Sequence, residues 1–67
     1  RIVIEVRDEI GVINDVPAVI KQYGVDITSL AVYHRPNRKA QILCHLDGEK
    51  ADEAVQALIQ KGFDITQ

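Results

Sequence analysis

The chain has little cysteine and no long hydrophobic run. Cys44 is the single cysteine among 67 residues, so no disulfide can form within the chain and no metal site can be built from several cysteines. No hydrophobic run approaches the ~20 residues that span a bilayer, and no signal peptide is visible. We therefore expect a cytoplasmic protein without a membrane partner.

An excess of basic residues is also absent. Lys and Arg number 8 against 10 for Asp and Glu, and the pI is about 5.5. Proteins that bind nucleic acid usually carry a basic stripe, so the composition does not predict a nucleic-acid partner. Methionine is missing as well, and the chain begins at Arg1. These two features lead us to expect a single domain, residues 1–67, excised from a larger protein.

Hydrophobic periodicity predicts four strands and two helices. Apolar residues recur at every second position in half-buried strands and at every third or fourth position in helices. The expected strands cover residues 1–7, 25–34, 39–47 and 63–66, with a turn at 35–38. One helix follows the first strand and ends at a glycine cap, Gly24. The other opens at Asp47 or Gly48, ends at Gly62 and has the apolar face Ala51, Ala54, Val55, Leu58 and Ile59.

The start of the first helix depends on Pro17, which has no N–H group. A start near Val12 would place Pro17 inside the helix and kink its first turns. A cap at Asn14 or Asp15 would instead place Pro17 in the first turn, where proline is well tolerated. The sequence is compatible with both starts.

The element order βαββαβ predicts an α+β ferredoxin-like sandwich. Two right-handed crossovers place both helices on one face of a four-stranded antiparallel sheet. The residues expected in the core are Ile4, Val6, Ile20, Ile42 and Leu58. The residues expected on the helix-free face include Val3, Leu30, Val32 and Leu43. That face would be apolar enough for us to expect a covering element or an extension of the sheet at an edge strand.

The segment Asp8–Asp15 joins the first strand to the first helix and is the first candidate site. Backbone N–H groups in the first turn of a helix have no partner within the helix, so they can bind an anion or a carboxylate. Gly11 lies at this joint, where the chain often needs backbone angles that glycine adopts easily. The joint is either one wall of a small-molecule site or only a turn.

Three short motifs of the chain resemble the ACT domain family. They are Asp8-Glu9-Ile10-Gly11-Val12-Ile13, Tyr23-Gly24-Val25-Asp26-Ile27 and Gly62-Phe63. The family has an Asp-Arg-Pro-Gly-Val-Leu joint, a Gly-Val-Asn-Ile entry to the second strand, and a late Gly-Phe or Gly-Tyr. Val32-Tyr33-His34 and the turn after it are most similar to the ACT segment of acetoin-utilisation-type proteins, in which paired CBS domains precede the ACT domain.

The resemblance implies a regulatory domain that has no catalytic activity and no cofactor. It implies a homodimer that binds an amino acid or a similar metabolite at the pair interface. The ligand-binding residues it implies are Asp8, Ile10, Gly11, Val12, Ile13 and Asp26. Two of them depart from the family pattern, because Ile10 replaces a proline and Asp26 replaces an asparagine that holds the ligand in some members. An ionised Asp only accepts hydrogen bonds, so Asp26 disfavours a ligand carboxylate and favours an ammonium or hydroxyl group.

A metal site would need histidines brought together by the second and third strands. The alternation places His34 and His45 on the helix-free face, where Asp26 or Asp47 could supply a third ligand. No spacing in the sequence requires such a site, and we expect solvated or interfacial histidines instead.

The remaining residues give little indication of a catalytic site. Cys44 alternates with hydrophobic residues and is expected in the core rather than as a nucleophile. Asp8, Glu9 and Asp15 could form an acid–base pair, but no nucleophile or oxyanion arrangement accompanies them. The sequence therefore predicts no enzyme.

Other proteins that share this fold are distinguished by residues rather than by topology. RNA-recognition modules stack bases on aromatic residues of the central strands, and the first and third strands here have none. Acylphosphatase cradles phosphate with an Arg in the first loop, whereas the loop here contains Asp8 and Glu9. A metallochaperone would need a Cys-x-x-Cys motif in that loop.

Two functional hypotheses remain after these exclusions. In the first, the domain senses a metabolite that binds at the joint between two subunits. In the second, it is a pairing module that fixes the geometry of attached domains and binds no small ligand. Both expect a homodimer that forms through an edge strand and the first helix.

Overall fold

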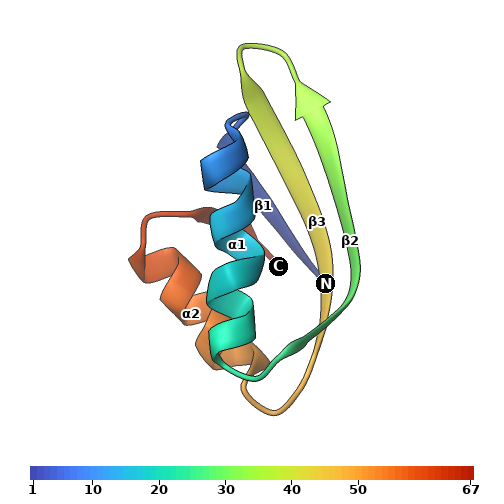
Figure 1. Cartoon of the computed structure of the whole chain (residues 1–67), viewed down its shortest axis with the longest axis vertical. Coiled ribbons are helices and arrows are strands. Elements are labelled where there is room, and N and C mark those ends of the chain that lie inside the picture. The colour runs from blue at the N-terminus through green and yellow to red at the C-terminus, as the bar shows by residue number, and fades with distance from the viewer.

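The computed structural model describes all 67 residues and shows the predicted fold. The elements are β1 (Ile2–Arg7), α1 (Ile10–Gln22), β2 (Asp26–Arg35), β3 (Lys39–Asp47), α2 (Ala51–Gln60) and β4 (Asp64–Thr66). All neighbouring strands are antiparallel, in the order β2-β3-β1-β4. Both helices lie on one face of this sheet (Figure 1). The prediction of an α+β ferredoxin-like sandwich is therefore confirmed.

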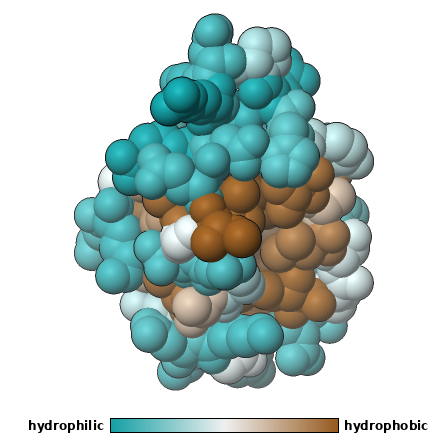
Figure 2. Space-filling model, turned by 45° about the horizontal axis from the view of Figure 1, so that its top comes forward, coloured by the Kyte–Doolittle hydropathy of each residue, from teal (hydrophilic) through white to brown (hydrophobic).

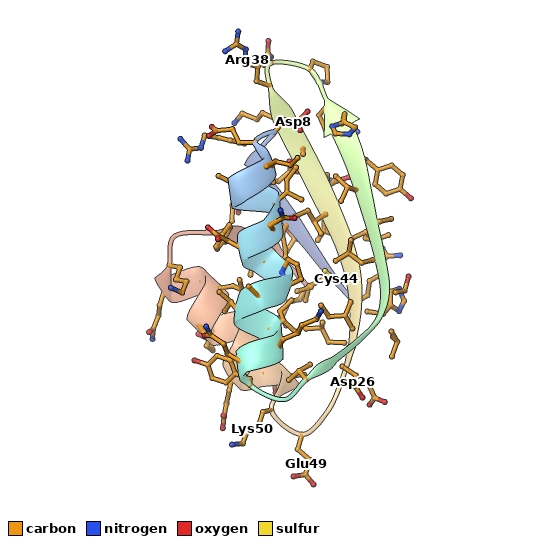
Figure 3. All side chains as sticks on the ribbon, in the orientation of Figure 1. Asp8, Asp26, Arg38, Cys44, Glu49 and Lys50 are labelled. Atoms are coloured by element: carbon orange, nitrogen blue, oxygen red, sulfur yellow. The ribbon has the colours of Figure 1, made fainter.

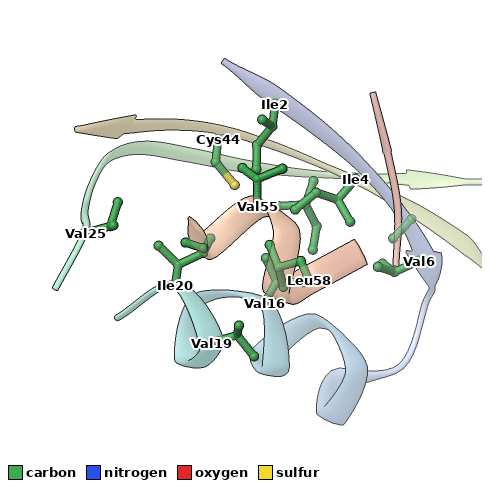
Figure 4. Close-up of a cluster of buried hydrophobic side chains, with 13 residues drawn as sticks. Ile2, Ile4, Val6, Val16, Val19, Ile20, Val25, Cys44, Val55 and Leu58 are labelled. Carbon is green, nitrogen blue, oxygen red and sulfur yellow. The ribbon is translucent and has the colours of Figure 1, made fainter. Parts of the chain in front are cut away.

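The core lies between the sheet and the two helices. Alternate residues of β1 and β3 point toward the helices, and each helix contributes one apolar stripe (Figure 4). The five predicted core residues, Ile4, Val6, Ile20, Ile42 and Leu58, are all buried. Cys44 is buried among them, as predicted. No helix of the chain is long and apolar enough to cross a membrane.

The end of α2 is a glycine cap, as predicted. Gly62 has a φ of +97°, a left-handed angle that residues with a Cβ adopt only with strain. Its N–H donates to the Ile59 carbonyl at 2.9 Å, and the Phe63 N–H donates to the Leu58 carbonyl at 3.1 Å. This pair of bonds is the Schellman arrangement, which satisfies carbonyls at the helix end and directs the chain back into β4.

The start of the first helix agrees with the predicted alternative near Val12, whereas the start of the second differs from the prediction. The first helix begins at Ile10, so Pro17 lies inside it, and the alternative with a cap at Asn14 or Asp15 is wrong. The second helix begins at Ala51 rather than at Asp47 or Gly48. The residues before it form the last part of β3 and a turn, because Asp47 still pairs with Asp26 across the sheet. At the other end of the predicted apolar face, Ile59 is 42% exposed.

A β-bulge in β2 changes which residues of that strand face the helices. Ile27 is opposite Leu46 and Ser29 is opposite His45, so Thr28 is an extra residue on β2. One extra residue exchanges the two faces of the rest of a strand, since side chains alternate. Leu30 is therefore opposite Cys44, and Val32 is opposite Ile42. The prediction that Leu30 and Val32 lie on the helix-free face is wrong, because both lie on the face that carries the helices.

Candidate functional site

The joint between β1 and α1 has free hydrogen-bond donors. The Ile13 N–H donates to the Glu9 carbonyl at 2.9 Å, which makes Glu9 the N-cap of α1. The three N–H groups before it, from Ile10, Gly11 and Val12, have no partner within the chain. No side chain caps the helix, and no acidic residue lies in its first turn. The joint can therefore offer backbone donors to a ligand, as predicted.

Gly11 has a different role from the one predicted. It lies within the first turn of α1 and does not adopt a left-handed angle. A Cβ added at Gly11 would have no neighbour within 4 Å. Glycine is therefore not required here by the turn or by packing within the chain, and the expectation that the joint needs the backbone angles of glycine is wrong. What glycine does provide is an open approach to the backbone of the first helical turn.

Asp8 is already engaged by a residue from β2. The His34 Nδ1 donates to the Asp8 Oδ2 at 2.7 Å, which ties the end of β2 to the joint. The Asp8 N–H also donates to the Arg38 carbonyl in the β2–β3 turn at 2.8 Å. Sequence reasoning missed the contact with His34, because the bulge moves His34 to the helix side, where it lies opposite Ala40. His45 stays on the helix-free face, so the prediction that the two histidines share a face is wrong.

Asp26 lies far from the other predicted ligand-binding residues. It begins β2, whereas Asp8 is next to the residues that end β2, and the two labels stand at opposite ends of the molecule (Figure 3). Asp26 is exposed and directly opposite Asp47, so two carboxylates meet there. Within one chain, the structure thus brings together residues 8–13 but does not add Asp26 to them.

Apolar side chains of β2 and of the start of α1 are only partly covered by the rest of the chain. The strand forms one edge of the sheet, beside the face that α1 covers (Figure 1). Leu30 is 43% exposed, and Ile27 and Val32 are half-buried, although all three face the helix side. Ile10 is 82% exposed at the start of α1, and Ile13 is half-buried one turn later. Figure 2 shows hydrophobic side chains gathered within a hydrophilic border on this side of the molecule. We call Ile10, Ile13, Leu30 and Val32 the apolar strip.

The chain has neither a cluster of three metal-binding side chains nor an exposed thiol. No group of three or more His, Cys, Asp or Glu side chains is placed to hold a metal ion. Burial away from water raises the pKa of the Cys44 thiol, which holds it in the unreactive protonated form. The side chain is fully enclosed by the core.

Comparison with known proteins adds no identification. No family model matches the chain, and no curated protein matches it.

Proposed function

We propose that this chain is a regulatory domain similar to ACT domains, which acts by pairing with a second copy and has no catalytic activity of its own. In this proposal an amino acid or a related metabolite binds at the interface of the pair. The parent protein would resemble the acetoin-utilisation type, with CBS domains attached. The observation that carries the proposal is the partly exposed apolar strip, which β2 and the start of α1 form.

The apolar strip supports pairing through β2 and α1. An edge strand exposes unpaired backbone groups, and a second strand can add to it directly. The side chains of Leu30 and Val32 would then be covered by the same residues of the partner, because a two-fold interface brings identical surfaces together. A domain of 67 residues also leaves a large share of its surface in water, so added burial has a large effect on its stability.

The positions of the predicted ligand-binding residues support a site shared by two chains. Two β2 strands related by a two-fold axis run antiparallel, so the start of one strand lies beside the end of the other. The end of β2 is next to the joint, as the bond between His34 and Asp8 shows. Asp26 of one copy would therefore approach the joint of its partner, although the two are far apart within one chain.

The hydrogen bond of Asp8 favours the second candidate, a pairing module without a ligand. His34 occupies one oxygen of Asp8 at 2.7 Å, so this carboxylate is less available to a ligand ammonium group. In that case the joint and its bond to His34 serve only to hold the end of β2 for pairing.

A thermal-shift screen with paired variants tests the proposal and separates the candidates. A ligand that binds only the native state adds ~2.7 kcal/mol of stability at a hundredfold excess over its Kd. We expect an amino acid or related metabolite to raise the midpoint of the wild type and of Ile59→Asp, but not of Leu30→Asp. Ile59 is the matched control, since it is 42% exposed against 43% for Leu30 but lies on α2.

Two outcomes of the screen would contradict the metabolite-sensing proposal. If no compound shifts the midpoint at millimolar concentration, the sensor hypothesis is wrong and the pairing module remains. If a compound stabilises Leu30→Asp as much as the wild type, its site lies within one chain and not at an interface of two.

A further inference from the structure

Three cationic residues stand side by side across the sheet on its helix-free face. Arg7 of β1 is directly opposite Lys39 of β3, and Lys39 is directly opposite Arg35 of β2. Like charges at directly opposite positions destabilise a sheet. Only Arg7 has a carboxylate within ion-pair distance, the Glu9 Oε2 at 3.3 Å from its Nε. We call Arg7, Arg35 and Lys39 the basic row, and its charges are unfavourable for folding unless an anion lies near them.

A cleft lies beside the basic row, where β4 does not extend along the last part of β1. β4 pairs only with Val3–Glu5, so the last part of β1 has no neighbour on that side. The cleft has a volume of about 570 Å³, which is within the usual range for small-molecule sites. Arg7 and Lys39 line one side of it, and Lys61 lines it from the end of α2. Three cations therefore surround one opening.

A free backbone donor also points toward this cleft. The Asp8 N–H donates to the Arg38 carbonyl on the β3 side at 2.8 Å. Since successive N–H groups of a strand point to opposite sides, the Arg7 N–H points toward the β4 side. Continuing the β1–β4 register places Gly62 opposite Arg7, but no hydrogen bond joins them. An anion in the cleft can thus accept a hydrogen bond from the Arg7 N–H group and contact the cationic side chains.

Carboxylates in the same cleft restrict which anion fits. Asp15 and Asp64 line it, and neither forms an ion pair within the chain. Glu5 lines it too, but its Oε1 accepts a hydrogen bond from the Gln41 Nε2 at 2.9 Å. A bare anion would be repelled by the two unpaired carboxylates. Mg²⁺ is commonly held by one or two carboxylates together with phosphate oxygens, so a phosphate chain that carries Mg²⁺ suits both signs of charge.

We propose that this cleft binds a magnesium-complexed di- or triphosphate group. Arg7, Lys39 and Lys61 hold the phosphate oxygens, and Asp15 and Asp64 hold the Mg²⁺. Arg7 and Lys39 come from adjacent strands, which lie ~4.8 Å apart, and Lys61 comes from the end of α2, so the three cations can contact more than one phosphate group. The cleft lies beside β4, at the opposite edge of the sheet from β2, although Val12 and Asp15 of α1 contribute to its lining.

Calorimetry with pyrophosphate as the probe tests this site. We expect saturable binding in the presence of Mg²⁺ and weaker binding when EDTA removes the ion, with the ionic strength held constant. Lys39→Gln and Lys61→Gln should each lower the affinity about tenfold or more, because each removes a charge-assisted hydrogen bond. Asp15→Asn should reduce the effect of Mg²⁺.

Two variants serve as controls for the binding measurement. Lys50→Gln removes an equal charge at the opposite end of the molecule, as the labels in Figure 3 show, and should bind like the wild type. Leu30→Asp should also retain pyrophosphate binding, which separates this site from the pairing proposal. Binding that is not saturable at millimolar pyrophosphate would contradict the proposed site. So would a loss of affinity in Lys50→Gln as large as in Lys39→Gln, or an unchanged affinity in both Lys39→Gln and Lys61→Gln.

Discussion

At the scale of single residues, Gly11 separates a binding role from a structural one. It lies in the first turn of α1, with space for a Cβ and no left-handed angle. Because alanine favours the helix over glycine, Gly11→Ala should raise the free energy of unfolding by a few tenths to ~1 kcal/mol. Urea denaturation measures this change. If the joint binds a ligand through its backbone, the same variant should lose affinity while it gains stability.

Gly62 supplies the contrast for this prediction. Its φ of +97° strains any residue with a Cβ, so Gly62→Ala should lower stability by ~1 kcal/mol or more. A lower midpoint for Gly11→Ala, similar to that of Gly62→Ala, would show that the joint does need glycine.

Cys44 makes the stability depend on pH at the alkaline end. Burial raises the pKa of its thiol in the folded chain above the ordinary value of 9.0. The unfolded chain therefore releases this proton at a lower pH than the folded chain, so stability is fully present below pH 9.0 and falls as the pH rises above it.

Urea denaturation of the wild type and Cys44→Ala at about pH 8 and about pH 10 checks the contribution of the thiol. We expect the wild type to lose more stability than the variant between the two values, since the other ionisable groups are the same in both proteins. An equal loss in both proteins would mean that the thiol does not contribute.

At the scale of elements, Pro17 weakens the helix that carries the joint. It lies inside α1, where it removes the hydrogen bond to the Ile13 carbonyl. Pro17→Ala should restore this bond and raise the free energy of unfolding by ~1–3 kcal/mol, less the entropy that proline removes from the unfolded chain. Chemical denaturation measures the change, and a variant that is less stable than the wild type would contradict the account of α1.

The strands and helices also show which features of the fold could be predicted from the sequence. Alternation identified β1 and β3 with their correct faces, because each has a regular pattern and one buried side. It misplaced Leu30, Val32 and His34, because β2 alternates in the sequence whether or not Thr28 is bulged. Only pairing with β3 reveals the extra residue. Pro17 left the start of α1 open between two positions in the sequence, and the structure has the earlier one, with Val12 and Ile13 packed against the core.

The geometry of the joint was predicted in part, and its role in binding stays a prediction. Residues 8–13 do lie together with free N–H groups, which follows from any strand that leads directly into a helix. The bond between His34 and Asp8 and the cleft beside β4 could not be predicted, because each depends on register across three strands. The basic row has the same origin, since Arg7, Arg35 and Lys39 are separated in the sequence and meet only through strand pairing.

At the scale of the whole molecule, the proposed pairing depends on what covers the apolar strip. The helices lie on one face of the sheet, and β2 is an edge strand of that sheet (Figure 1). On this face of β2, Leu30 stays exposed and Val32 half-buried. Pairing through this edge would bury the strip, join two sheets into one and bring each joint near the partner's copy of Asp26. The regulatory proposal depends on this pairing.

Sedimentation equilibrium of the wild type, Leu30→Asp and Ile59→Asp tests the pairing most directly. A charge at Leu30 would be buried in the pair without a partner, whereas a charge at the equally exposed Ile59 would remain in water. We expect the wild type and Ile59→Asp to be dimers at high micromolar concentration and Leu30→Asp to be a folded monomer. A monomeric wild type at that concentration, or a Leu30→Asp variant that remains a dimer, would contradict the account.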